Sequence, residues 1–122
     1  MVENNVLAEK SIEFAIRIVN CYKYLTKHKH ETVMSKQVLR SGTSIGANVH
    51  EAIYAQSKAD FVNKMNISMK EAGETSYWLT ILHRTEYIDT EMYNSIDSDL
   101  KEILKILAST IKTSKINEQQ NV

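Results

Sequence analysis

One run of residues constrains the fold of this chain more than any other feature of its sequence. Between positions 61 and 86 a seam recurs at alternating steps of four and three residues, at Phe61, Met65, Ser68, Ala72, Thr75, Leu79, Leu82 and Glu86. This alternation is the repeat of left-handed helix bundles, in which each helix turns one seam toward its neighbours. Small residues in the middle of the seam indicate that another helix lies close to it. The segment is therefore predicted to be one helix of a bundle.

Three further segments show the same helical character. The chain of 122 residues has no proline and three glycines, so little in it interrupts a helix. Ser57 and Asp60 resemble a capping box for the helix described above, and Asp89 or Thr90 is expected to cap the last helix. The expected helices cover about residues 6–27, a stretch from about 32, residues 61 to about 86, and a stretch from about 90.

Short polar connections join these helices. Links of about three to six residues place consecutive helices side by side and antiparallel. We therefore expect an all-α fold, an antiparallel up-down-up-down four-helix bundle, as one domain over residues 1–122. The polar tail from about Ser114 is expected to fray.

The distribution of charge along the chain indicates where an anionic partner would bind. The formal net charge is zero, but residues 1–70 hold ten Lys or Arg against six Asp or Glu, and the remainder holds five against nine. The first part thus carries a formal charge of +4 and the second −4, so an anionic partner should meet the first part. The chain begins without a basic and apolar leader and has no run of about 18 apolar residues. We expect a soluble, cytoplasmic protein with no membrane contact.

Catalytic and metal-binding patterns are weak or missing. Cys21 is the only cysteine, which excludes an intramolecular disulfide and fits a reducing compartment. No Glu-x-x-His pair of the kind that holds a di-iron site in a bundle is present. His28 and His30 lie in a polar turn without a cysteine nearby, where a solvated turn is favoured over a metal site. The sequence predicts no catalytic residue, no metal, no cofactor and no enzymatic activity.

The stretch from residue 39 to 52 holds two of the three glycines and admits two interpretations. It lacks the Gly-Lys-Ser/Thr ending of a phosphate-binding loop and follows no strand. As a continuous helix, it places Gly42 and Gly46 one turn apart on a smooth face for a crossing helix. Close packing there must offset about 2 kcal/mol of lost helix propensity.

The opposite face of this helix carries a polar ridge. Arg40, Ser44, Asn48 and Glu51 recur at steps of four, four and three. The ridge is either a solvated or intersubunit hydrogen-bond ladder, or a contact for a ligand or nucleic acid. Together with Ser41 and the two glycines, these residues form the expected packing and interface motif.

Basic residues gather around the first connection. Aromatic and histidine side chains are interleaved with them, a combination that suits phosphate contacts and base stacking. A solvated, charged end of the bundle is the alternative. The candidate nucleic-acid contacts, to RNA or DNA, are Arg17, Lys23, Lys27, Lys29, Lys36 and Arg40.

The first and third helices have more apolar surface than a four-helix core can cover. On the first helix the apolar arc is much wider than the stripe of about 100° that packing on one side requires. On the third, Ile67, Trp78 and Ile81 lie away from the buried seam. We therefore expect a homo-oligomer joined through these two helices.

The motif Leu39-Arg40-Ser41-x-x-Ser44-Ile45-x-Ala47-Asn48-x-x-Glu51-Ala52 resembles the proteins encoded in intervening sequences of bacterial 23S ribosomal RNA genes. Residues 70–79 and 100–107 are similar to the third and fourth helices of that family. The resemblance implies an antiparallel four-helix bundle that assembles into a pentameric ring without established enzymatic activity. It also implies kinship with accessory proteins of diversity-generating retroelements, which are strongly basic, whereas this chain is near neutral.

Two functions are consistent with these features of the sequence. The first is a non-enzymatic oligomeric scaffold, or accessory protein associated with nucleic acid. The alternative is a protein-protein adaptor with no nucleic-acid role. The two hypotheses differ in whether the basic residues contact phosphate.

Overall fold

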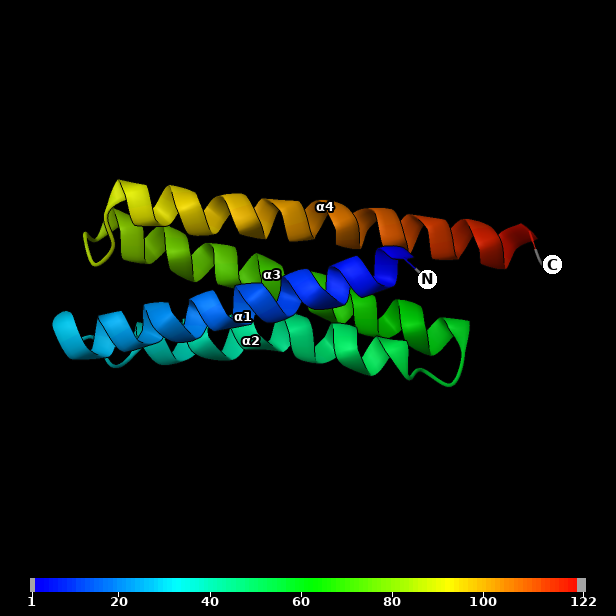
Figure 1. Cartoon of the computed structure of the whole chain (residues 1–122), viewed down its shortest axis with the longest axis horizontal. Coiled ribbons are helices and arrows are strands. Elements are labelled where there is room, and N and C mark those ends of the chain that lie inside the picture. Colours follow the sequence, from blue (N-terminus) through cyan, green and yellow to red (C-terminus); the bar gives the residue numbers. More distant parts are fainter. Residues whose placement is uncertain (1, 121–122) are drawn as a thin grey trace.

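The computed structural model describes residues 2–120, with side chains described from residue 6 to residue 116. It consists of four helices in sequence: α1 (Val2–His28), α2 (Met34–Ile53), α3 (Lys58–Arg84) and α4 (Thr90–Gln120). The connections α1–α2 and α3–α4 lie at one end of the molecule, and the α2–α3 connection and both termini lie at the other (Figure 1). The all-α, antiparallel four-helix bundle is confirmed.

Each helix packs against the helix that follows it, and α4 returns to α1. The contact between α2 and α3 is the most extensive, and that between α1 and α4 is the smallest. The bundle is therefore closed least tightly along the seam between its first and last helices.

One apolar core runs through all four helices. Its largest fully buried side chains are Leu7, Phe14, Ile18, Leu25, Ile45, Met65, Leu79, Leu82, Ile88, Leu100, Ile103 and Leu107. The seam predicted on α3 is buried from Met65 to Leu82. It does not reach Glu86, which is exposed because α3 ends at Arg84.

Side chains cap the helices as the sequence predicts at two of the connections. Ser57 Oγ accepts a hydrogen bond of 3.1 Å from the backbone N–H of Asp60 at the start of α3. Asp89 Oδ1 accepts a bond of 2.8 Å from the N–H of Met92 at the start of α4. These caps satisfy N–H groups that have no partner within the helix.

The start of α2 is capped by a residue that the sequence did not single out. Glu31 is buried, and its carboxylate accepts hydrogen bonds of 3.1, 2.9 and 2.7 Å from the N–H groups of Val33, Met34 and Ser35. Burial acts to raise the pKa of Glu31, but these backbone bonds outweigh it and hold the pKa below its usual range. A buried carboxylate thus fixes the turn between α1 and α2.

The last helix is longer than expected. It continues to Gln120, past Ser114, and the fraying expected from about Ser114 stays a prediction. Residues 112–120 contain neither glycine nor proline, so nothing in them stops the helix. Residues 1, 121 and 122 of the expected domain lie outside the described part of the chain.

Candidate functional site

The two glycines of α2 lie where α1 crosses it. A Cβ atom on Gly42 would lie 2.8 Å from side-chain carbons of Ile18, and one on Gly46 would lie 3.3 Å from the backbone O of Ser11. Both glycines are buried within an unbroken helix. They therefore allow the α1 backbone to approach α2 closely, and they do not form a phosphate-binding loop.

Another face of α2 is bonded to α3 by small hydroxyl side chains. The hydroxyl of Ser68 donates to the backbone O of Ile45 at 2.8 Å. The hydroxyl oxygens of Ser41 and Thr75 are 2.9 Å apart, and both side chains are buried. The small residues in the α3 seam are thus the place where α2 and α3 come together, with their polar atoms satisfied.

The polar ridge of α2 makes its contacts within the chain. Ser44 donates to the carbonyl of Arg40 at 2.6 Å, and Asn48 donates to the carbonyl of Ser44 at 2.8 Å. Glu51 lies 3.7 Å from the Lys64 ammonium on α3. Within the chain, the ridge therefore forms a ladder along α2 and an ion pair to α3, and its role as an interface motif stays a prediction.

Arg40 is held between two carboxylates of α3. Its guanidinium forms ion pairs with Glu71, at 3.2 Å, and with Glu74. The indole N–H of Trp78 donates to the same Glu74 carboxylate at 3.2 Å. The Arg40 hydrogen bond, followed by that from Trp78, lowers the pKa of Glu74. Arg40 therefore joins α2 to α3 and does not present a free charge.

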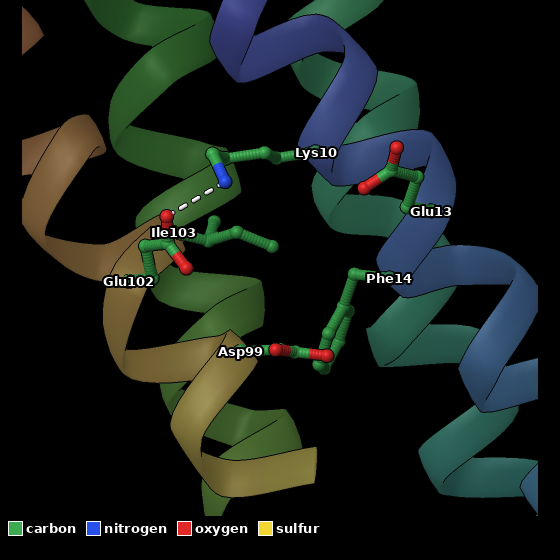
Figure 2. A pocket seen from close by; sticks show the side chains of 6 residues that line it. All are labelled: Lys10, Glu13, Phe14, Asp99, Glu102 and Ile103. Carbon is green, nitrogen blue, oxygen red and sulfur yellow. Dashed lines mark ion pairs between the residues drawn. The ribbon is translucent and has the colours of Figure 1, made fainter. Parts of the chain in front are cut away.

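Arg17 is engaged on a different side of the bundle. Its guanidinium bonds to Asp99 Oδ2 at 2.8 Å and to Ser95 Oγ at 2.9 Å, both on α4. About two turns earlier on α1, the Lys10 ammonium lies 2.6 Å from Glu102 Oε1 on α4 (Figure 2). Figure 2 shows the two helices facing each other across this seam, with Glu102 and Asp99 on α4. Ion pairs thus close the smallest helix contact of the bundle.

The remaining four candidate contacts carry no ion pair within the described part of the chain. All four lysines are exposed: Lys23 and Lys27 on the last turns of α1, Lys29 in the connection, and Lys36 in the first turn of α2. The structure therefore separates the six predicted cations. Arg17 and Arg40 face other helices, and Lys23, Lys27, Lys29 and Lys36 remain as candidate phosphate contacts.

An apolar groove lies between α1 and α2 on the outside of the bundle. It has a volume of about 610 Å³ and is lined by Ser11, Ile12, Ala15, Ile16, Val19, Asn20, Lys23, Thr43, Gly46, Ala47 and His50. Ile16 is 57% exposed and Ile12 is 39% exposed. This groove is the surplus apolar surface that the sequence indicates on the first helix.

The surplus on α3 is smaller. Trp78 packs partly into the core, and Ile67 and Ile81 are partly buried. Tyr77 is 58% exposed beside them, with its ring 5.1 Å from that of Trp78. Most of the expected apolar excess of α3 is therefore covered within the subunit.

A second, polar hollow lies at the end of the bundle that holds the α1–α2 and α3–α4 connections. It has a volume of about 510 Å³, and its lining includes Tyr24, Lys29, His83, Arg84, Glu86 and Tyr87. The site was not predicted from the sequence. The expected antiparallel topology nevertheless implies that the last turns of α1 and α3 lie at the same end of the bundle. Arg84, a basic residue in the last turn of α3, could have been added to the basic cluster on this ground.

The one cysteine of the chain is a buried, free thiol. Burial raises the pKa of the Cys21 thiol to about 11, and the nearby Arg17 charge lowers it only in part. The thiol is therefore protonated at neutral pH and is a poor nucleophile. Among residues 2–120, no group of three or more His, Cys, Asp or Glu is placed to hold a metal ion. None of the helices in that range combines the length and apolar composition of a membrane span.

Comparison with known proteins places this bundle in a family. No curated protein matches the chain. A crystal structure of a protein of unknown function, from the S23 ribosomal protein family of Bacteroides thetaiotaomicron VPI-5482, is 62% identical in sequence. The match covers 90% of this chain and 98% of the other, with a TM-score of 0.89. The family described as 23S rRNA-intervening sequence protein matches residues 3–109. The chain therefore belongs to the 23S rRNA-intervening sequence protein family.

Proposed function

We propose that this protein is a non-enzymatic homo-oligomer whose assembly presents a set of unpaired cations to nucleic acid. The observation that carries the proposal is the position of Lys23, which lines the apolar α1–α2 groove and is one of the exposed lysines around the α1–α2 connection. A contact between copies through this groove brings the cations of neighbouring subunits to one rim. The near-neutral charge of the single chain conceals such a rim.

Self-association is supported by the chemistry of the groove. Exposed isoleucines that line a concave apolar surface are typical of a surface that is covered by a partner. Soluble oligomers are most often assemblies of identical chains with closed symmetry. The family resemblance implies a ring of five subunits, and we propose that number for this chain.

Nucleic-acid binding is supported by four lysines that carry unpaired charges in the described part of the chain. Lys23, Lys27, Lys29 and Lys36 are exposed and make no ion pair within the described residues, whereas Arg17 and Arg40 do. Unpaired lysines bind phosphate by releasing the cations condensed on nucleic acid, so the affinity falls steeply with salt. Presentation of several copies on one assembly raises the effective affinity further.

The test is a gel-shift titration with RNA and DNA over a series of salt concentrations. The expected result is binding at low salt that weakens as salt rises, with a shallower dependence on salt when Lys23, Lys27 and Lys29 are changed to glutamine. The matched control changes Lys105, Lys112 and Lys115 of α4 to glutamine, removing the same charge elsewhere. Equal losses in the two triple variants would place the contact outside the proposed surface.

The second candidate function is a protein-protein adaptor with no nucleic-acid role. The same apolar groove favours it, since a helix of another protein could occupy the space that we assign to a second copy. The gel-shift titration separates the two candidates. An absence of any shift at low salt would remove the nucleic-acid role and leave the adaptor.

A further inference from the structure

The polar hollow at the end of the bundle has walls that are held in place by contacts within the chain. The His83 ring stacks on Tyr93 with centroids 4.4 Å apart and planes 10° apart. His83 Nε2 also lies 3.1 Å from Thr90 Oγ1. Asp89, which lines the hollow as well, is occupied as the cap of α4. His83 Nε2 and Asp89 Oδ1 are thus already engaged with α4.

Three charged side chains around the hollow are not engaged in this way. Lys29 and Arg84 are exposed and form no ion pair within the described residues. The carboxylate of Glu86 forms neither an ion pair nor a hydrogen bond there. Tyr24 and Tyr87 are partly buried and line the same hollow. The hollow thus combines two free cations, one free carboxylate and two aromatic rings.

Glu86 also has an unusual backbone conformation. Glu86 has a φ of 68°, in the left-handed region that favours glycine or asparagine. Its N–H donates to the carbonyl of His83, and the next N–H, that of Tyr87, donates to the carbonyl of Leu82. Glycine would close the end of α3 with less strain. Glu86, which lines the hollow, therefore occupies this position at some cost to the stability of the helix end.

We infer that this hollow binds an unpaired guanine nucleotide of single-stranded RNA. A base that stacks on the tyrosines lies between the cations, which contact the flanking phosphates. Guanine presents two adjacent N–H donors on its Watson–Crick edge, and these match the two oxygens of the Glu86 carboxylate. Cytosine, adenine and uracil place an acceptor beside their donor, which a carboxylate repels. A base inside a duplex has this edge paired and cannot enter.

This inference rests on the proposed nucleic-acid role, and the experiment separates the two. Fluorescence anisotropy is measured at low salt with three labelled RNA probes of equal length. One is single-stranded with guanines, one is single-stranded with uridine in place of each guanine, and one is the duplex of the first. We expect the guanine probe to bind at least about fivefold more tightly than the other two, the discrimination of one bidentate pair.

The decisive variant is Glu86→Gln, which keeps the size of the side chain and removes its second acceptor. We expect the guanine preference to disappear while the affinity for the uridine probe stays equal or rises, because a negative charge has been lost. The matched control is Glu91→Gln, which removes the same charge from the first turn of α4 outside the hollow and should keep the preference. A general electrostatic effect would instead change all probes equally in both variants.

Different results of this experiment would contradict the guanine site and the proposed function. Salt-dependent binding with equal affinity for all three probes would overturn the guanine site and leave the proposed function intact. A guanine preference that survives in Glu86→Gln would overturn the assignment of the site to this hollow. An absence of binding to every probe would overturn the guanine site, and it would overturn the proposed function as well if the low-salt titration also shows no shift of DNA.

Discussion

At the scale of single residues, the three glycines of this chain occupy three different surroundings. Gly42 and Gly46 face α1 at distances that exclude a methyl group or leave it little room. Gly73, in the middle of α3, is exposed, and a Cβ atom there would meet nothing within 4 Å. The sequence predicted the crowding at the first two from their spacing. The open surroundings of the third could not be read from the sequence, because they depend on which face α3 turns outward.

The same substitution at two of these glycines should have opposite effects. Gly42→Ala places a methyl group 2.8 Å from Ile18, and we expect a loss of about 1 to 3 kcal/mol in the free energy of unfolding. Gly73→Ala relieves only the poor helix propensity of glycine, and we expect a gain of about 1 kcal/mol. Urea denaturation followed by circular dichroism measures both. Destabilisation of equal size at both positions would contradict this assignment of the crossing.

Glu31 makes the stability of the bundle sensitive to pH. Its pKa is lowered in the folded chain from an ordinary value of 4.5, so its contribution is complete above that value and is lost as the pH falls through the folded pKa. We expect Glu31→Gln to lower the free energy of unfolding by about 0.5 to 2 kcal/mol at pH 7, as for the loss of a helix cap.

The difference between Glu31→Gln and the natural chain should shrink as the solution is acidified below about pH 4, where the carboxyl of the natural chain is protonated as well. Urea denaturation at a series of pH values measures this difference. Glu9→Gln, at an exposed position of α1, is the control and should show no such closing gap. A gap for Glu31→Gln that is constant from pH 7 to pH 3 would show that the carboxylate does not cap α2 through its charge.

At the scale of the element, α2 is the helix around which the others are arranged. One face carries the glycines and accepts α1, another carries Ser41 and Ile45 and accepts α3, and the outer ridge bonds along the helix. The Arg-Ser-x-x-Ser-Ile-x-Ala-Asn motif is therefore largely a packing motif. Because its residues are spaced at helical intervals, a continuous helix could be predicted from the sequence. The groups that contact the motif could not be predicted, because a polar ridge has the same residue pattern whether it faces water, α3 or another subunit.

The end of α3 offers a test at the same scale. Glu86 adopts a φ of 68°, a conformation that costs a residue with a Cβ about 1 to 2 kcal/mol. We expect Glu86→Gly to raise the free energy of unfolding by about 0.5 to 1 kcal/mol, because the more flexible unfolded chain offsets part of the relief. Thermal denaturation measures the change. Glu86→Ala, which keeps the Cβ, is the control and should not stabilise the chain.

At the scale of the whole molecule, the topology decides which predicted residues act together. Seam spacing, the scarcity of helix breakers and the short connections were sufficient to predict the four-helix bundle. The six basic residues, in contrast, are neighbours in the sequence but do not all share one surface of the bundle. Arg17 on α1 lies against α4, and Arg40 on α2 lies against α3, because each is on a face of its helix other than the one where α1 and α2 meet. Only the packed bundle shows that Arg84 and Tyr87 approach the first connection from the other end of the chain.

The central claim at this scale is that copies of the chain join through the α1–α2 groove. Sedimentation velocity at micromolar concentration tests it most directly, with Ile16→Glu on the groove and Ile116→Glu on α4 as its matched control, since both isoleucines are exposed. We expect the natural chain and Ile116→Glu to sediment as one discrete oligomer, five chains by our proposal, and Ile16→Glu to sediment as a folded monomer. A natural chain that sediments as a monomer, or an oligomer that Ile16→Glu leaves intact, would contradict the claim.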